Sequence, residues 1–258
     1  MSESFLRGGI FLSGLVLFSS LEYFIPYRER LFKRSQRWPG NLLLIFISNV
    51  LLTGLAPLSL LSFSRLAEEG SVGLLNNVEM HYPLEFIFAL VALDFAVYLQ
   101  HVLSHRVPLL WRFHRVHHSD ADLDATSALR FHPVEIIFSI IYKGGGVVLL
   151  GASFEAVFVF EVILNFTAMF NHSNIYIPQR VESQLRNFIV TPQMHIIHHS
   201  TLSKFSNTNY GFNLSIWDKF FRSYQGDVGG EFTIGQLDCQ DVQSHKLKTL
   251  LLLPFKKN

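Results

Sequence analysis

The sequence predicts an all-α protein that crosses a membrane about four times and carries a histidine-rich helical cap on the cytosolic side. Hydrophobic residues make up 49% of the 258 residues and charged residues only 16%, which lies outside the usual range of soluble proteins. Ten of the twelve histidines lie between His101 and His199. We see no second-domain boundary, so we treat 1–258 as one domain with three parts: two N-terminal membrane helices (1–82), a histidine-rich core (83–225) and a C-terminal surface segment (226–258).

Hydropathy places the expected membrane spans. A bilayer core about 30 Å thick needs roughly 20 apolar residues per helix, and residues 5–26, 41–63 and 83–103 provide three such windows. A fourth apolar stretch, 134–170, is nearly twice as long as one span. We expect the Lys-Gly-Gly-Gly run at 143–146 to bend it into a hairpin or a re-entrant pair of helices. No signal-peptide cleavage pattern follows the first window, so we expect that helix to be retained.

The distribution of Lys and Arg predicts the orientation. The loop at 28–37 is densely basic, whereas the loop at 64–82 has one Arg and three Glu. By the positive-inside rule the first loop is cytoplasmic. The third span then delivers His101 and the residues after it to the cytoplasmic face. This face belongs to the inner or plasma membrane in a bacterium and to the endoplasmic reticulum in a eukaryote.

Other features of the composition exclude several classes. The net charge of +1 gives no sign of a nucleic-acid surface. The single Cys239 excludes a disulfide framework and a cysteine-built metal site within this chain. The tail at 245–258 mixes Leu with Lys, which is typical of a segment on a membrane surface. We expect His81 and His245 to be ordinary surface residues.

The histidines follow a repeated spacing. Two HxxHH boxes place three imidazoles each on one face of a helix, and an HxxxH pair ends the third span. Further histidines stand in "RFHP" and "NHSN". Ten imidazoles suit two metal ions with about five ligands each, more than a structural or hydrolytic zinc requires. The candidate ligands are His101, His105, His114, His117, His118, His132, His172, His195, His198 and His199.

Polar residues inside the membrane windows lie in register with these histidines. We expect the polar side chains to accept the free ring N–H of a ligand histidine and to fix its orientation. An intramembrane acid can instead pair with an Arg or Tyr, and a histidine before Pro133 can serve as a helix cap. The stripes are Asp94, Tyr98, His101 and His105 on the third span, and Glu161, Asn165 and His172 on the fourth stretch.

Three motifs, "HVLSH", "HRVHH" and "HIIHH", resemble the histidine boxes of the fatty acid hydroxylase superfamily. This integral-membrane family includes sterol desaturases, sterol methyl oxidases and alkylglycerol monooxygenase. The flanking "LLWRFHRVHHSDADLDATSALRFHPVE", "NHSN" and "TPQMHIIHHSTLSKFSNTNYGFNLSIWDKFF" resemble its bacterial sterol-desaturase-like members. The resemblance covers about 94–224, and the first eighty residues match only as hydrophobic helices.

The resemblance implies a non-haem centre of two iron ions that uses O2 to oxidise a C–H bond of a lipid. Zinc could replace the iron in purified protein. The eight histidines of the three motifs match the family's ligands, His172 matches a further "NH" histidine, and His132 matches a histidine that often follows the second box. A segment after the last box also matches, and there we expect groups that support the ligands or face the substrate: Asn207, Asn209, Tyr210 and Gly211.

The sequence leaves the exact reaction open. Several relatives fuse a cytochrome b5-like domain to the enzyme, and this chain has no room for one, so we expect a separate ferredoxin, cytochrome or reductase as electron donor. A GxGxxG motif for nicotinamide is absent. A lipid hydroxylase is the leading hypothesis, and a desaturase with the same metal site is the alternative. From other classes, a membrane metal transporter or metal-binding protein stays open, and a membrane zinc hydrolase lacks the HExxH motif.

Overall fold

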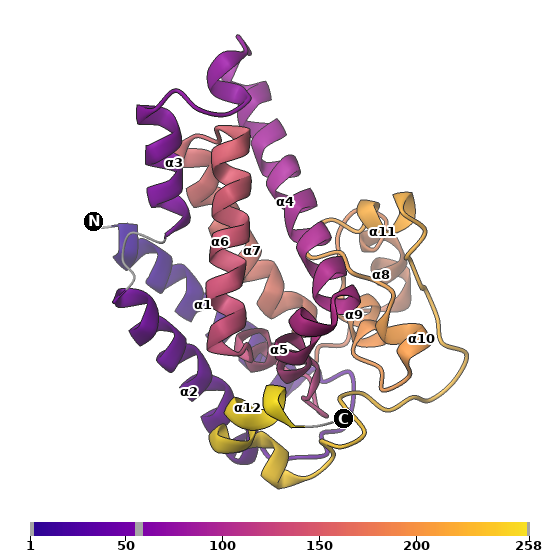
Figure 1. Ribbon diagram of the computed structural model, residues 1–258. Helices are drawn as coiled ribbons and strands as arrows, with labels where there is room; N and C mark the ends of the chain where they lie inside the picture. Colours follow the sequence, from indigo (N-terminus) through magenta and orange to yellow (C-terminus); the bar gives the residue numbers. More distant parts are fainter. Residues whose placement is uncertain (1–2, 55–58, 257–258) are drawn as a thin grey trace.

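The computed structural model describes residues 3–54 and 59–256, and over these residues the chain is built from helices without a β-strand (Figure 1). Four helices are long and apolar enough to cross a membrane: α1 (Glu3–Phe24), α4 (Tyr82–Arg106), α6 (Pro133–Leu150) and α7 (Phe154–His172). At a rise of 1.5 Å per residue each can cross a hydrocarbon core about 30 Å thick. The predicted all-α, multi-pass architecture is confirmed.

The predicted span at 41–63 is wrong as one continuous helix. The structure forms two helices there, α2 (Arg34–Thr53) and the short α3 (Leu60–Glu69), and residues 55–58 lie outside the described part. The first half of α2 is polar, and its Arg37 and Asn41 are fully buried against the cap. At the start of α3, the Ser59 hydroxyl accepts a hydrogen bond from the Ser62 N–H. Because its polar half must face the cap, α2 has too few apolar residues to span a bilayer.

The long apolar stretch forms the expected hairpin, but its turn lies elsewhere. Residues 143–146 continue α6 as regular helix, and the chain turns after Gly151, whose φ of 70° is left-handed. Gly144 serves packing: a Cβ there would lie 2.3 Å from the Phe63 ring, so glycine lets α3 approach α6 closely. The glycine run therefore marks a helix contact, not the bend.

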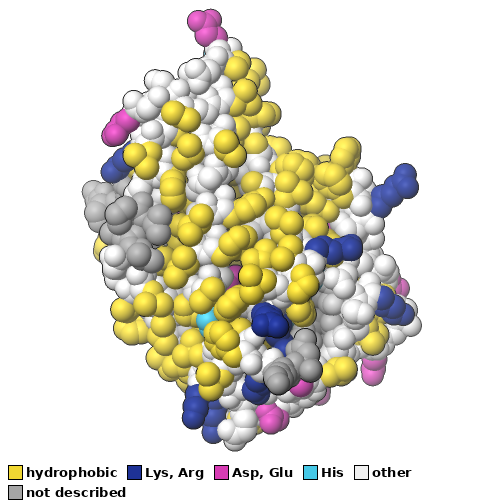
Figure 2. Space-filling model, viewed as in Figure 1, with side chains coloured by type: hydrophobic (Ala, Val, Ile, Leu, Met, Phe, Trp, Pro, Cys, Tyr) yellow, Lys and Arg dark blue, Asp and Glu magenta, His cyan; other side chains and the backbone are white. Residues whose placement is uncertain are grey.

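The spanning helices pack into a bundle around an apolar core. Helices α3, α4 and α6 lie side by side with α7 behind them (Figure 1), and α1 packs against α7. The core residues are Leu60, Leu61, Leu75, Ala89, Leu93, Val97, Val147, Ala152, Ala156, Val157, Phe160 and Leu164. Hydrophobic side chains spread over the upper and middle parts of the surface, and Lys and Arg gather toward its lower end (Figure 2). This distribution is typical of a protein embedded in a bilayer.

The cap is a set of short helices below and beside the bundle. Proline at the first helical position starts α5 and α9, which carry the two HxxHH boxes. The remaining short elements are η1 (Leu75–Asn77), α5 (Pro108–His118), η2 (Ala125–Leu129), α8 (Gln179–Leu185), α9 (Pro192–His198), α10 (Ser203–Ser206), α11 (Ile216–Phe220), η3 (Val242–His245), α12 (Leu247–Leu252) and η4 (Leu253–Phe255).

A buried ionic network fixes α2 to the loop after the second box. The Arg37 guanidinium donates to both oxygens of Asp120 at 2.9 and 2.7 Å and to Asp124 at 2.7 Å. All three side chains are fully buried. The Arg37 charge holds the pKa of the Asp120 carboxyl well below its usual range, although burial alone would raise it. The pairing keeps the Asp120 carboxylate ionised inside the cap.

The C-terminal segment closes this network, and one prediction fails there. His245 is fully buried instead of lying on the surface, with its Nδ1 at 3.2 Å from the Arg130 guanidinium. Arg130 also donates to the Ser119 hydroxyl at 2.8 Å. Burial lowers the pKa of His245 to about 4, so its ring stays neutral and can accept from Arg130. The tail docks here because Leu250 and Leu253 are fully buried as well, against Leu44 of α2.

Candidate metal centre

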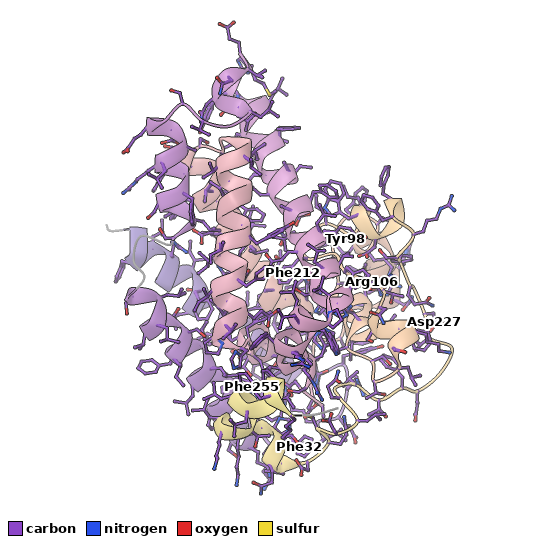
Figure 3. The ribbon with its side chains drawn as sticks, viewed as in Figure 1. Phe32, Tyr98, Arg106, Phe212, Asp227 and Phe255 are labelled. Carbon is purple, nitrogen blue, oxygen red and sulfur yellow. The ribbon has the colours of Figure 1, made fainter. Side chains whose placement is uncertain are left out.

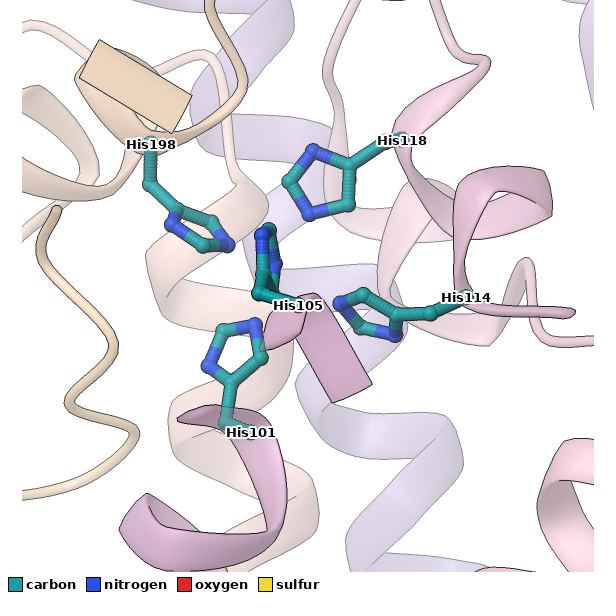
Figure 4. A group of neighbouring side chains, drawn as sticks. All are labelled: His101, His105, His114, His118 and His198. Carbon is teal, nitrogen blue, oxygen red and sulfur yellow. The ribbon is translucent and has the colours of Figure 1, made fainter. Parts of the chain in front are cut away.

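Nine of the ten candidate ligands converge in two neighbouring groups beneath the bundle. Within each group, one ligand atom from every member lies within 4.8 Å of those of the others. The first group has five members (Figure 4): His101, His105, His114, His118 and His198. The second has four: His117, His172, His195 and His199. The rings of His118 and His199 stack at 4.4 Å between centroids, so the two groups are adjacent.

Each HxxHH box contributes to both groups. In α5, His114 and His118 join the first group and His117 the second. In and just after α9, the division is reversed: His198 joins the first group, His195 and His199 the second. Residues i and i+4 of a helix point in nearly the same direction, and i+3 points slightly aside. The spacing thus lets one helix supply ligands to two adjacent sites.

Carbonyl and carboxylate oxygens fix the orientation of four rings. The Nδ1 atoms of His101, His172 and His198 each lie 2.7 Å from a main-chain oxygen, belonging to Tyr210, Ala168 and Thr208 respectively. The Nδ1 atom of His114 lies 2.6 Å from Glu135 Oε1. Since these oxygens only accept, Nδ1 must carry the proton. Each Nε2 is then a free lone pair directed into its group.

The first group contains ring nitrogens that have no other use. In the described residues, the Nε2 atoms of all five members are buried and lack a hydrogen-bond partner. An unsatisfied buried polar atom is unfavourable and needs an explanation. Convergent imidazole lone pairs are the donor set that first-row transition metals prefer. The residues of the first group therefore fit a metal ion.

The second group also fits a metal ion, because its ring nitrogens lie very close together. The Nε2 of His172 lies 3.0 Å from that of His117 and 3.1 Å from that of His195, which in turn lies 3.2 Å from that of His199. The Nε2 of His172 carries no proton and can only accept, so His117 and His195 would both have to donate to it. The Nε2 of His195 then has no lone pair left for His199, and the three contacts cannot all be hydrogen bonds. Nitrogens about 2.0–2.1 Å from a common ion would themselves lie roughly 3 Å apart. A cation among them satisfies all four lone pairs.

Burial keeps five of the clustered histidines neutral. Desolvation, reinforced by repulsion from neighbouring imidazoles, lowers the pKa of His117, His118, His195 and His199 well below the usual value. Burial likewise lowers the pKa of His198 to about 3. Their lone pairs are therefore available at physiological pH without prior loss of a proton.

His132 is the predicted ligand that the structure does not bring into either group. It precedes Pro133, the first residue of α6, and its Nδ1 accepts a hydrogen bond from the Val134 N–H at 3.2 Å. Its ring packs against Phe113, and Phe255 of η4 lies close to both (Figure 3). The helix cap and the docked C-terminal segment together hold this ring away from the metal groups.

Four side chains were expected to support the ligands, and among the described residues none of them bonds to a ligand ring: Asp94, Glu161, Asn165 and Asn209. Asp94 accepts from the Trp217 indole at 2.8 Å and from the Leu214 N–H, and so anchors the segment after the last box. Glu161 pairs with Arg7 at 3.0 Å, and Asn165 donates to the Glu161 main-chain oxygen.

Asn209 shapes the loop that orients two ligands. It adopts a left-handed φ of 53°, and its amide donates to the carbonyls of Met194 and Gln225, both at 2.9 Å. Its side-chain oxygen accepts from the Gln225 N–H. The neighbouring carbonyls of Thr208 and Tyr210 are those that bind His198 and His101. Asn209 therefore acts on the histidines through the backbone.

Sequence reasoning missed two acidic residues. Glu135 orients His114, and its only sequence signal is an acid in the first turn after "RFHP". Asp218 accepts from the N–H groups of Tyr210 and Gly211 at 2.8 and 2.7 Å. A Cβ on Gly211 would lie 2.7 Å from the Asp218 carboxylate, which explains the glycine. No pattern in the sequence pairs Asp218 with that loop.

A cavity of about 190 Å³ runs from the first group into the bundle. His101, His114 and His117 line its inner end. Most of the wall is apolar, and Phe212, which lies at the centre of the molecule in Figure 3, forms part of it. The cavity lies between α1, α2, α4, α6 and α7, so it connects the histidines with the apolar interior of the bundle.

Comparison with known proteins places the chain in a family. Residues 86–223, more than half of the sequence, match the fatty acid hydroxylase family. The chain belongs to the fatty acid hydroxylase family. The matched segment contains all nine clustered histidines, together with Glu135 and Asp218.

The relatives of this fatty acid hydroxylase family member are lipid hydroxylases and monooxygenases. It is 32% identical over 145 residues to an ornithine lipid hydroxylase of Rhizobium tropici, which covers 55% of this chain and 43% of that protein. It is 28% identical to human alkylglycerol monooxygenase, over 59% of this chain and 33% of that protein. It is also 28% identical to human cholesterol 25-hydroxylase, over 52% of this chain and 48% of that protein. The chain thus matches less than half the length of each of these relatives. No solved structure matches it.

Proposed function

We propose that this protein is an O2-dependent, non-haem di-iron enzyme that hydroxylates a C–H bond of a membrane lipid. The observation that supports it best is the pair of histidine groups with free, buried ring nitrogens at the inner end of an apolar cavity. The relatives are named for hydroxylation of an ornithine lipid and of cholesterol and for monooxygenation of an alkylglycerol, which supports the same type of reaction here. The lipid that this chain uses is a separate question.

The nine clustered histidines would hold the two ions, five in the first group and four in the second. When bound, iron would supply the electron transfer to O2 that amino-acid side chains cannot perform. The chain's own part is to orient and to exclude water. Glu135 and the carbonyls of Tyr210, Thr208 and Ala168 hold the rings, and the apolar wall directs an alkyl group toward them.

The surroundings that we propose follow from the fold. The lipid enters from the bilayer, because the cavity lies among membrane helices. The histidine groups face the cytoplasm, in keeping with the basic residues of α2 and the loop before it. Two electrons per turnover come from a separate ferredoxin, cytochrome or reductase.

A desaturase is the second candidate, because the same oxidising centre can remove hydrogen from two adjacent carbons. A metal transporter is less well supported. Transport requires ligands along a path across the membrane, whereas all nine clustered histidines gather at one end of the bundle. The structure of the products separates hydroxylase from desaturase.

The deciding experiment measures iron in gently purified protein from cells grown on iron-57, by elemental analysis and Mössbauer spectroscopy. We expect about two irons per chain, in keeping with two sets of imidazole ligands, and their loss in a His117→Ala, His198→Ala double variant. His81→Ala, an exposed histidine remote from both groups, is the matched control. A single zinc that survives the double substitution would rule out the di-iron enzyme.

A further inference from the structure

One face of α6 connects the metal groups with the interior of the membrane region. Glu135, Ser139 and Lys143 follow each other at intervals of four, so they share one side of the helix, and all three line the cavity. Glu135 bonds to His114 at the inner end. Since a helix rises 1.5 Å per residue, Lys143 lies roughly 12 Å from Glu135 along the axis. Lys143 therefore marks the end of the cavity remote from the histidines.

The Lys143 side chain has no partner of its own. It is half-buried, and within the described residues it makes no hydrogen bond and no ion pair. The nearest carboxylate, Glu161, is close enough to interact with it electrostatically but is bound by Arg7 at 3.0 Å. Two cations and one anion leave an excess positive charge in this part of the membrane region. An uncompensated charge at this depth is costly and marks a functional site.

Uncharged polar side chains from α4, α6 and α7 also line the cavity. Gln100 and Ser139 lie within 3.4 Å of each other, and Asn165 stands on the facing helix α7. Apolar side chains, among them Val97, Ile136, Leu164 and Phe212, make up much of the remaining wall. The cavity thus joins a cationic end at Lys143 to a metal-binding end at the histidines, along a largely apolar wall.

We propose that Lys143 binds the anionic head group, a carboxylate or phosphate, of a single-chain lipid whose alkyl chain extends through the cavity toward the histidines. If the protein is the proposed lipid hydroxylase, this binding sets the position that is oxidised by its distance from the head group. That consequence rests on the proposed function. An ammonium ion with three donors can bind either anion. Gln100 and Asn165 line the same cavity and carry amide N–H donors.

The first test measures binding and needs no metal. Radiolabelled dodecanoate and dodecyl phosphate are titrated, by scintillation proximity, against the full chain in nanodiscs of phosphatidylcholine, with dodecanol as the neutral competitor. We expect saturable binding of at least one anion, weakened about tenfold or more in Lys143→Met and largely retained in Lys143→Arg. Ile141→Met, on the exposed side of the same helix, is the control. Lys143→Gln provides a second neutral variant should the first not fold.

The outcomes are distinct. The anion that binds better identifies the head group. Equal binding to wild type and both neutral variants, or competition by dodecanol as strong as by the anions, would overturn the role of Lys143. In iron-loaded enzyme, carboxylates of increasing length should be hydroxylated at a constant distance from the carboxyl group, and Lys143→Met should scatter that position. Failure of oxidation with anion binding intact would count against the proposed function alone, and oxidation unaffected by Lys143 would count against this inference alone.

Discussion

His114 Nδ1 lies 2.6 Å from Glu135 Oε1, and this contact ties the second histidine box to the first turn of a membrane helix. It is the only bond between a clustered histidine and a carboxylate within 4.0 Å among the described residues. The same residue, Glu135, begins the face of α6 that lines the cavity. One helix, α6, therefore contacts the first metal group and also lines the cavity.

Removing this carboxylate should weaken metal retention without unfolding the protein. We expect Glu135→Ala to lower metal affinity about 10- to 100-fold, because His114 loses the acceptor that fixes its tautomer. Glu135→Gln, whose amide oxygen can still accept, should lose less. The measurement is the rate of iron loss to a chelator. Glu155→Gln, an exposed acid in the first turn of α7, is the control, and equal iron loss from all variants would contradict the assignment.

His132 and His172 should respond differently to substitution. His172→Ala removes a member of the second group, so we expect loss of about one iron per chain. His132→Ala removes only a helix cap, which costs about 0.5–2 kcal/mol of stability. Elemental analysis and thermal unfolding on the same samples compare the two. If His132→Ala loses iron while its unfolding temperature stays unchanged, His132 is a metal ligand after all.

Arg37 should be among the most sensitive positions for stability. Arg37→Leu removes the ion-pair partner of the buried Asp120 and Asp124, and breaking a buried ion pair on one side costs about 3–5 kcal/mol. We expect a much lower unfolding temperature in detergent, if the variant accumulates at all. Arg180→Leu, at an exposed arginine, should behave like wild type. A small effect of both substitutions would show that the network does not hold α2 in place.

Stability should fall in acid through Asp120. Its folded-state pKa lies well below the unfolded value, which is about 3.9, so the pairing contributes fully above that value. The contribution is lost as the pH falls from about 4 toward the folded pKa. Unfolding temperatures measured between neutral pH and about pH 3 should decline at the acidic end. The Asp120→Asn variant should have a lower unfolding temperature at neutral pH, and that temperature should change less with pH below about pH 4. If the variant's unfolding temperature falls in acid as steeply as that of wild type, Asp120 is not the cause of the fall.

Cys239 should report whether the C-terminal segment is docked. The thiol is 1% exposed and packs with Leu44, Leu250 and Leu253. Burial, aided by the neighbouring Asp238, raises its pKa to about 11, so little thiolate exists at neutral pH. We expect a maleimide to label it only after denaturation. Rapid labelling of the native protein, absent in Cys239→Ala, would show that the segment opens readily.

Much of the site was predictable because its determinants are local. The i, i+3, i+4 spacing places three imidazoles on one side of a helix whatever the rest of the chain does. Apolar length likewise predicted the spanning helices at 83–103 and within 134–170. Local spacing could not show that each box divides between two groups, since that depends on how α5 and α9 face each other.

The predictions that failed depended on distant contacts. Hydropathy predicts one span at 41–63, but Arg37 pairs with Asp120 and Asp124, and this draws the polar half of α2 into the cap. His245 looked like a surface residue until Arg130, far away in sequence, supplied its partner. The glycine run at 143–146 looked like a bend because hydropathy does not reveal that Phe63 packs against Gly144.

The sequence by itself determined an all-helical membrane protein with a histidine-rich site, because helix periodicity, bilayer thickness and ligand chemistry act over short stretches of chain. Only the tertiary structure decided which nine histidines meet, that Glu135 orients His114, and that Lys143 lines a cavity with no hydrogen bond or ion pair to the rest of the described chain. These relationships join residues from different helices, and their distances are set by packing, which no local pattern encodes.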